Sequence, residues 1–171
     1  MEDLKKSIRD IPDFPKKGII FKDITPLLQD AALFKKAVDL LSEKFKGMRI
    51  DKVVSIESRG FILGSAIAYK LGASFIPVRK KGRLPYLTHK ASYDLEYGQD
   101  TLEIHQDAVR KGDKILIVDD LLATGGTIGA VIDLVKKMHG EISGIGFLIE
   151  LTFLNGREKN KGCNIFSLIK Y

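Results

Sequence analysis

Short apolar runs alternate along the chain with stretches of helical periodicity. The run Lys114–Val118 is typical of a strand buried on both faces, and helical spacing follows over Gly125–Met138. The run Lys52–Ile56 is followed in the same way by Arg59–Leu71, with Gly72 placed to end that helix. Strands that alternate with helices build βαβ units. The pattern therefore predicts an α/β fold with a central, mainly parallel sheet flanked by helices.

Further elements follow from the same periodicities. Asp30 is a candidate N-cap for a helix that ends near Gly47, because apolar residues recur at helical spacing between them. Pro77 favours a sheet edge or a strand end for its strand, since proline cannot donate to a ladder. The expected remaining strands are Phe75–Val78, Ile142–Leu151 and Ile165–Ile169, with a hairpin over Tyr93–His105 that turns at Gly98.

Three segments do not fit the alternation. Lys80–Ser92 is basic and aperiodic, and a loop of that length inside one domain is usually functional or disordered. Ile11–Pro26 and Thr152–Asn164 are expected to form a cap over the edge of the sheet.

The amino-acid composition limits the possible number of domains and the possible cellular location. With 171 residues, 44% of them hydrophobic and 29% charged, the chain suits one domain. The single cysteine, Cys163, cannot form an intramolecular disulfide, and no apolar run approaches the roughly 20 residues of a membrane helix. No secretory signal is evident, so we expect a cytoplasmic location. The net charge of +6 fits nucleic-acid binding, a site for a phosphorylated small molecule or a lysine-rich surface, and does not decide among them.

The segment Ile117–Thr127, with the sequence Ile-Val-Asp-Asp-Leu-Leu-Ala-Thr-Gly-Gly-Thr, carries the chemistry. A buried strand delivers Asp119 and Asp120 at its carboxyl end, where parallel sheets bind ligands. The turn Thr124–Thr127 then offers backbone N–H groups, two hydroxyls and a helix N-terminus to a phosphate. Paired carboxylates suit sugar hydroxyls better than a second phosphate. The segment therefore predicts a ribose 5-phosphate site.

Other phosphate-binding and metal-binding patterns fit less well. Two aspartates after a strand also suit a metal-binding Walker B strand, but no G-x-x-x-x-G-K-[ST] sequence accompanies them. The Gly144–Gly146 stretch lacks the third glycine of a dinucleotide fingerprint. The histidines at positions 89, 105 and 139 have no metal-ligand spacing.

The Val118–Thr127 sequence resembles the phosphoribosyl pyrophosphate motif of type I phosphoribosyltransferases, and is most similar to that of the adenine-specific members. The resemblance covers nearly the whole chain. The matching segments are Phe14–Pro26 (the hood over the base), Glu57–Phe61 (the pyrophosphate loop), Arg79–Pro85 and Ser92–Gly98 (the two ends of a mobile loop), Glu150–Thr152 and Gly156–Lys159.

The resemblance implies a fold and a reaction. The fold would be a single domain, residues 1–171, with a hood from about residues 1–30 and 152–164 and a β-hairpin lid whose mobile loop covers about residues 80–98. The reaction would join adenine to phosphoribosyl pyrophosphate, giving AMP and pyrophosphate. Mg²⁺ would be held by substrate and water without a direct protein ligand. The resemblance implies a homodimer with small-molecule substrates, and we expect neither a nucleic-acid nor a membrane partner.

The resemblance also assigns site residues. Glu96 would carry the proton of the base, Tyr97 would help to close the site, Arg59 would assist catalysis, and a cis peptide would join Glu57 to Ser58. The other expected roles are ribose 5-phosphate binding by Asp119, Asp120, Ala123, Thr124, Gly125, Gly126 and Thr127; pyrophosphate binding by Glu57, Ser58, Arg59, Gly60, Arg79, Lys80 and Arg83; and adenine binding by Ile20, Phe21, Lys22 and Leu121.

Two alternatives remain open at this point. The first is a different base, namely hypoxanthine, guanine or xanthine, although the hood and pyrophosphate segments favour adenine. The second is a regulator that senses phosphoribosyl pyrophosphate and binds nucleic acid, although no helix-turn-helix is evident. Family members often carry arginine where this chain has Lys22, and the two side chains are not interchangeable at forked contacts.

Overall fold

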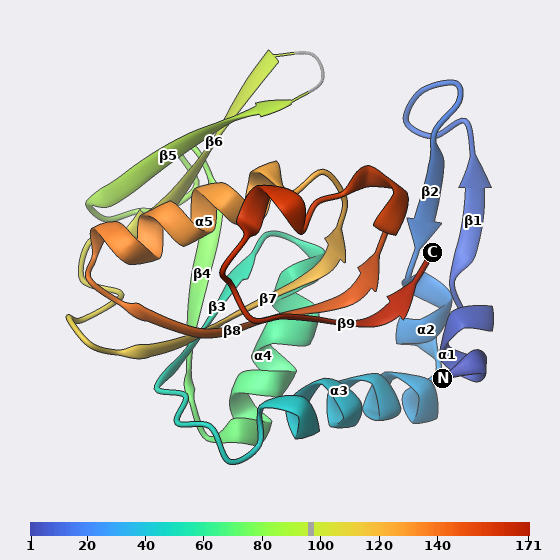
Figure 1. The fold of residues 1–171 in the computed structure, drawn as a ribbon, viewed down its shortest axis with the longest axis horizontal. Helices are drawn as coiled ribbons and strands as arrows, with labels where there is room; N and C mark the ends of the chain where they lie inside the picture. The colour runs from blue at the N-terminus through green and yellow to red at the C-terminus, as the bar shows by residue number, and fades with distance from the viewer. Residues whose placement is uncertain (96–97) are drawn as a thin grey trace.

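The computed structural model of the chain describes residues 1–95 and 98–171. Its central sheet has, among these residues, seven strands in the order β5-β6-β4-β3-β7-β8-β9 (Figure 1). The pairs β3–β4, β3–β7, β7–β8 and β8–β9 are parallel, so the predicted mainly parallel sheet is confirmed. The strands are β3 (Lys52–Ile56), β4 (Ser74–Lys80), β5 (Thr88–Leu95), β6 (Gly98–His105), β7 (Lys114–Leu122), β8 (Glu141–Glu150) and β9 (Ile165–Lys170).

Helices cover both faces of the sheet. Helices α3 (Ala31–Phe45) and α4 (Arg59–Leu71) lie on one face and α5 (Gly126–Lys137) on the other (Figure 1). Local signals explain their limits. Asp30 caps α3 by accepting from the N–H groups of Ala32 and Leu33, and Gly72 follows α4 in the left-handed region at φ 67°. The predicted bounds of α4 are confirmed.

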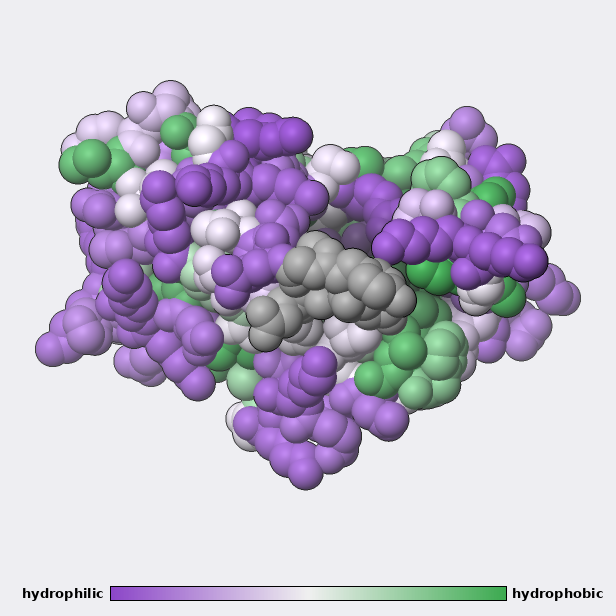
Figure 2. Space-filling view, turned by 90° about the horizontal axis from the view of Figure 1, so that it is seen from above, coloured by the Kyte–Doolittle hydropathy of each residue, from purple (hydrophilic) through white to green (hydrophobic). Residues whose placement is uncertain are grey.

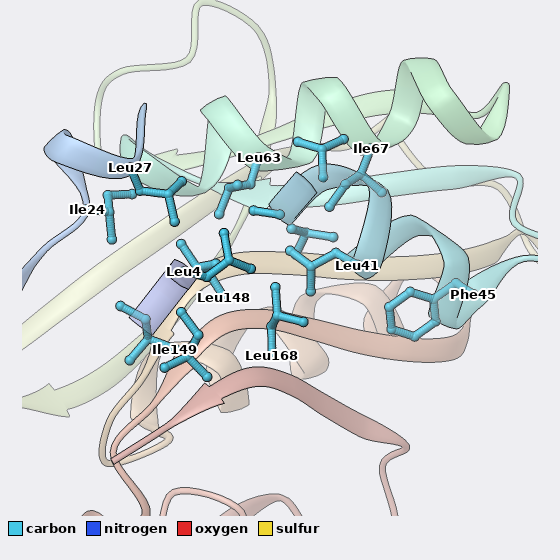
Figure 3. Close-up of a cluster of buried hydrophobic side chains, with 14 of the residues drawn as sticks. Leu4, Ile24, Leu27, Leu41, Phe45, Leu63, Ile67, Leu148, Ile149 and Leu168 are labelled. Carbon is cyan, nitrogen blue, oxygen red and sulfur yellow. The ribbon is translucent and has the colours of Figure 1, made fainter. Parts of the chain in front are cut away.

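Each face of the sheet has its own hydrophobic core. On the α3 and α4 side, Leu41, Phe45 and Leu63 pack with Leu148 and Leu168 of the sheet (Figure 3). On the other side, α5 packs on β7 and β8 through a second cluster that includes Val131, Val135, Ile117 and Ile145.

The N-terminal segment forms a small unit of its own. It comprises α1 (Glu2–Lys6), the antiparallel pair β1 (Arg9–Pro12) and β2 (Ile20–Asp23), and α2 (Thr25–Gln29). We call this unit the hood. Leu4, Ile24 and Leu27 are fully or almost fully buried in the core of the α3 and α4 side (Figure 3), which fixes the base of the hood to the domain.

Three sequence-based expectations need correction. The aperiodic loop expected over Lys80–Ser92 spans only residues 81–87, because β5 begins at Thr88. The sequence carries no signal for β5 because the segment contains few apolar residues. The buried side chains of this hairpin, Leu102 and Ile104, come from its partner β6. Strand β7 also continues past Val118 through both aspartates, since it pairs with β8 as far as Leu122.

The third correction concerns β4, which lies inside the sheet rather than at its edge. Pro77 is tolerated there because the described pairs between β4 and β6 involve only Arg79 and Lys80, beyond the proline.

Two further features complete the description. The expected cis peptide between Glu57 and Ser58 is confirmed. The segment Thr152–Asn164 contains two short 3-10 helices, η1 (Thr152–Leu154) and η2 (Glu158–Asn160). Within residues 1–95 and 98–171, every helix is too short or too polar to cross a lipid bilayer.

Candidate active site

The candidate site lies at the carboxyl ends of β3 and β7. Pairing between these parallel strands ends at Ser55 and Val118, and the next residues on β7 are the two aspartates. On β3 the chain runs through Glu57 and Ser58 directly into α4. Ligands of open α/β sheets bind at this edge. The two segments predicted to carry chemistry therefore converge.

Two adjoining cavities open at this edge. The apolar cavity, about 580 Å³, is lined by residues 18–22 of the hood, the turn after β7, and Leu151, Phe153, Leu154 and Tyr171. The acidic cavity, about 380 Å³, is lined by Glu57, Ser58, Arg59, Lys80, Asp119 and Asp120, among others. Tyr93, Leu121, Ala123 and Thr127 line both. Of the residues expected to bind the base, Ile20, Phe21 and Lys22 line only the apolar cavity, and Leu121 lines both. Of those expected to bind pyrophosphate, Glu57, Ser58, Arg59 and Lys80 line the acidic cavity, whereas Gly60, Arg79 and Arg83 line neither of the two.

The turn Thr124–Thr127 has the geometry of an anion site. Helix α5 begins at Gly126, and its N-terminus has no side-chain cap. The first N–H groups of a helix have no partners within it, so they are available to a ligand. Gly125 has φ 82°, and a Cβ there would lie 2.4 Å from the carbonyl oxygen of Gly156. Both the backbone conformation and the close packing therefore require glycine.

The aspartate pair is tightly constrained. The N–H of Asp120 donates to Oδ1 of Asp119 at 2.9 Å, and a Cβ at Gly60 would lie 2.6 Å from the same oxygen. Gly60 therefore serves the packing of α4 against the acidic pair. Burial, and then the neighbouring charge of Asp120, raise the pKa of Asp119 well above its ordinary value.

Arg59 joins the acidic pair to the hood. Its Nε lies 2.8 Å from Oδ2 of Asp120, and its guanidinium lies over the ring of Phe21, 4.7 Å from the centroid. Burial raises the pKa of Asp120, and the charge of Arg59 opposes that shift. Arg59, which the sequence predicts to bind pyrophosphate, is therefore already paired with a carboxylate of the protein. Its side chain is 32% exposed, and it lines the acidic cavity.

The comparisons with known proteins agree with this geometry. Residues 24–162 match the phosphoribosyl transferase domain family. The adenine phosphoribosyltransferase of Geotalea daltonii is 61% identical over 171 residues, all of both chains, and that of Thermotoga neapolitana is 57% identical over 169 residues, 99% of both chains. The crystal structure of the Thermoanaerobacter pseudethanolicus enzyme has a TM-score of 0.97 at 54% identity and covers 99% of both chains.

The chain belongs to the adenine phosphoribosyltransferases. The yeast member, solved with an imino-altritol bisphosphate and adenine, is 40% identical with a TM-score of 0.92, covering 98% of this chain and 97% of its own. The resemblance read from the sequence is thus confirmed, together with the type I phosphoribosyltransferase fold and the adenine phosphoribosyltransferase activity.

In this adenine phosphoribosyltransferase, Glu57 gathers the predicted pyrophosphate-binding cations. Arg79 Nε donates to Oε2 of Glu57 at 2.8 Å, the N–H of Lys80 donates to Oε1 at 2.9 Å, and Arg83 Nε lies 3.6 Å from Oε1. These partners hold the pKa of Glu57 below its ordinary value although burial opposes them. Glu57 therefore anchors the start of the β4–β5 connection. Of these cations, Lys80 lines the acidic cavity, with its Nζ 3.1 Å from Asp100.

The hood brings its predicted residues to the apolar cavity. Ile20, Phe21 and Lys22 all line it, together with Leu121 from β7. The Lys22 side chain is held between the hood and the C-terminus, because its Nζ donates to Asp10 at 2.6 Å and lies 3.8 Å from the centroid of the Tyr171 ring. The predicted catalytic residues Glu96 and Tyr97 lie outside the described residues.

Sequence reasoning missed several residues that line the cavities. Tyr93 faces both, and burial raises the pKa of its hydroxyl. It belongs to the segment Ser92–Gly98, which the resemblance had already singled out. Leu151, Phe153 and Leu154 come from the C-terminal segment. The sequence predicted that residues 152–164 belong to the cap, but it assigned no binding role to these three side chains. Seen from above, hydrophobic residues lie on the right of the molecule, the side of the hood (Figure 2).

Proposed function

We propose that the two cavities divide the substrates of this adenine phosphoribosyltransferase between them. Adenine would occupy the apolar cavity and the pyrophosphate of the donor the acidic one. The observation that supports this proposal is that the cavities meet at Leu121, Ala123 and Thr127, beside the phosphate-binding turn. A donor lodged there has its reacting carbon between the base and the leaving group.

The ribose 5-phosphate would bind as the sequence predicted. Its 5′-phosphate would accept hydrogen bonds from N–H groups and hydroxyls of Thr124–Thr127, at the positive end of α5. Its two ring hydroxyls would donate to Asp119 and Asp120, which line the acidic cavity. Carboxylates accept hydrogen bonds from hydroxyls but repel a phosphate. The geometry supports this arrangement because the aspartate pair lies near the end of β7, and the turn Thr124–Thr127 follows that strand and leads into α5.

The base would lie against the hood. Ile20, Phe21 and Leu121 provide flat apolar contacts, and backbone groups of β2 can read the edge of a purine. The Arg59 guanidinium over the ring of Phe21 couples this wall to the acidic pair. The yeast relative solved with adenine and the Giardia lamblia relative solved with 9-deazaadenine support a purine in this fold.

The reaction would break the bond between the sugar and pyrophosphate as a nitrogen of adenine bonds to the same carbon. Arg59 and Lys80 would stabilise charge on the departing pyrophosphate. The proton released by the base would pass to Glu96, which is implied by the resemblance alone. The two cavities, by holding base and donor together, would supply the orientation that this displacement needs.

The acidic cavity also fits a magnesium ion that arrives with the donor. Asp119 lines the cavity and offers carboxylate oxygen to water bound by the metal, the chemistry that Mg²⁺ prefers. Groups of three or more His, Cys, Asp or Glu placed to hold a metal do not occur in the part of the chain that the structure describes. When bound, Mg²⁺ neutralises negative charge on the leaving group.

We also propose that the enzyme works in the cytoplasm as a homodimer. The single cysteine, which has no partner within the chain for a disulfide, fits a reducing compartment. The homodimer rests on the family resemblance. Size-exclusion chromatography with light scattering would measure the mass in solution, and the mass of one chain would contradict a dimer.

An assay with four bases tests the function. The purified enzyme, phosphoribosyl pyrophosphate and MgCl₂ would be combined with adenine, hypoxanthine, guanine or xanthine. We expect kcat/KM for adenine to exceed the others by tenfold or more, and excess EDTA to stop turnover. A tenfold preference for a 6-oxopurine would overturn the adenine assignment, and unchanged turnover in EDTA would overturn the magnesium proposal.

A further inference from the structure

Asn160 lies directly behind the turn that follows β7. It is a polar residue in the interior, with only 7% of its surface exposed. Its Nδ2 donates two hydrogen bonds, to the carbonyl oxygen of Gly125 at 3.1 Å and to that of Gly156 at 3.0 Å. A buried amide that satisfies two backbone carbonyls of different segments links those segments.

The segments that Asn160 links pack backbone against backbone. A Cβ on Gly156 would lie 2.3 Å from the carbonyl oxygen of Ala123, and a Cβ on Gly125 would lie 2.4 Å from that of Gly156. Side chains are therefore excluded from this contact on both sides. The position of the turn depends on residues 156–160, which we call the C-terminal brace.

The C-terminal brace is itself held firmly. Arg157 donates from Nε and Nη2 to the two carboxylate oxygens of Glu150 at 2.6 and 2.7 Å. It also donates to the carbonyl oxygen of Ile165 at 2.7 Å and to the hydroxyl of Ser167 at 3.1 Å. Because these partners belong to β8 and β9, the brace transmits the rigidity of the sheet to Asn160.

Planarity of the peptide bond connects Asn160 to the ligand. The C=O of Gly125 and the N–H of Gly126 belong to one planar group and point in opposite directions. Two donors hold that carbonyl: Nδ2 of Asn160 on the side of the brace and the N–H of Gly129 in the first turn of α5, each at 3.1 Å. The N–H of Gly126 is thereby directed to the other side, and Gly126 lines the apolar cavity.

We propose that Asn160 is a positioning residue for the 5′-phosphate of the donor. Together with the first hydrogen bond of α5, it fixes the Gly125–Gly126 peptide so that the Gly126 N–H faces the phosphate before the donor binds. This role rests on the proposed phosphate site at Thr124–Thr127. It adds a residue from the C-terminal segment that does not touch the substrate.

Asn160→Leu tests the proposal, because leucine has nearly the same volume and cannot donate. We expect the KM for phosphoribosyl pyrophosphate to rise about tenfold, with kcat and the KM for adenine within threefold of the wild type. Phosphate contacts bind the ground and transition states alike, so their loss appears in KM. The matched control is Asn164→Leu at an exposed asparagine four residues along, which should change each constant less than twofold.

Two further variants separate the possible outcomes. Thr127→Val removes a hydroxyl proposed to bind the phosphate. If it raises the donor KM while Asn160→Leu does not, the role of Asn160 is overturned and the phosphate site stands. If neither variant changes the donor KM, both are overturned. Should Asn160→Leu fail to fold by circular dichroism, Asn160→Ala removes both hydrogen bonds without adding bulk or charge, and a donor KM within twofold of the wild type would likewise overturn the proposal.

Discussion

At the scale of single residues, the pair Asp119 and Asp120 is proposed to bind the donor but lowers the stability of the ligand-free fold. Burial and mutual repulsion raise the pKa of Asp119, which means that its charged form is disfavoured in the folded protein. A carboxylate in that environment destabilises the fold at neutral pH. The proposed ribose site would account for the pair, because the hydroxyls of the donor would donate hydrogen bonds to these carboxylates.

Asp119→Asn should therefore make the ligand-free enzyme more stable and less active. Because the folded pKa is raised, the destabilisation is absent below the ordinary value of 3.8 and grows as pH rises towards the folded pKa. Urea unfolding should show a gain in stability at pH 7 that disappears near pH 4. The kcat/KM for the donor should fall by roughly tenfold to a hundredfold, because a hydrogen bond to a charged group contributes about 1.5–3 kcal/mol.

The control for this prediction is Asp133→Asn, at an exposed position on α5. It should alter neither the unfolding free energy nor kcat/KM appreciably. A loss of stability in Asp119→Asn at pH 7 would contradict the account of the pair.

At the scale of secondary-structure elements, Glu57 connects the end of β3 to the basic connection after β4. It accepts from Arg79 and from the backbone of Lys80, and its side chain is only 7% exposed. The acidic residue at the start of the predicted pyrophosphate loop thus acts inside the protein. It holds the backbone of Lys80 and the side chain of Arg79 in place, and it also lines the acidic cavity.

Glu57→Gln should destabilise the enzyme by about 1–3 kcal/mol at pH 7, as expected for hydrogen bonds to a charged group. The pKa of Glu57 is lowered from its ordinary 4.5, so the stability that it contributes is present above that value. This contribution is lost as pH falls through the folded pKa. Urea unfolding from pH 7 to pH 3 should show the two proteins converging in acid. A difference that stays constant with pH would rule out this role for the charge.

The C-terminal brace gives a second prediction for the elements β8 and β9. Arg157→Leu would leave the buried Glu150 carboxylate without its partner, which should cost about 3–5 kcal/mol. Arg157→Leu combined with Glu150→Leu should recover much of that loss, because no unpaired charge remains. Urea unfolding of the two single variants and the double variant at pH 7 measures the coupling. Additive losses would show that the pair does not act as a unit.

Local signals explain which elements were predictable from the sequence. Asp30 and Gly72 set helix ends through contacts with their own neighbours, so the bounds of α3 and α4 follow from the sequence. The turn Thr124–Thr127 was predictable because its donors are consecutive. The start of β5 at Thr88 and the packing of Gly156 against Ala123 depend on residues far apart in the chain, and no local pattern indicates them.

At the scale of the whole molecule, the site is built from three distant parts of the chain. The hood, the carboxyl edge of the sheet and the segment after β8 all contribute walls to the apolar cavity. The base of the hood is buried in the main core through Leu4, Ile24 and Leu27, so these walls are held in a common frame. Substrate binding should therefore stabilise the molecule as a unit.

Thermal unfolding measures that stabilisation. Phosphoribosyl pyrophosphate with MgCl₂, at about a hundred times its Kd, should stabilise the fold by about 2.7 kcal/mol and raise Tm by roughly 5–10 °C. The Thr127→Val variant should need a higher donor concentration for the same shift. No shift at millimolar donor with magnesium would mean that the folded protein does not bind it.

The most direct test of the central claim is a crystal structure of the enzyme with AMP. We expect the 5′-phosphate within hydrogen-bonding distance of the backbone N–H groups of Thr124–Thr127, the ribose hydroxyls on Asp119 and Asp120, and the base between Phe21 and Leu121. An AMP phosphate bound in the acidic cavity beside Lys80, or anywhere away from the turn, would contradict the account.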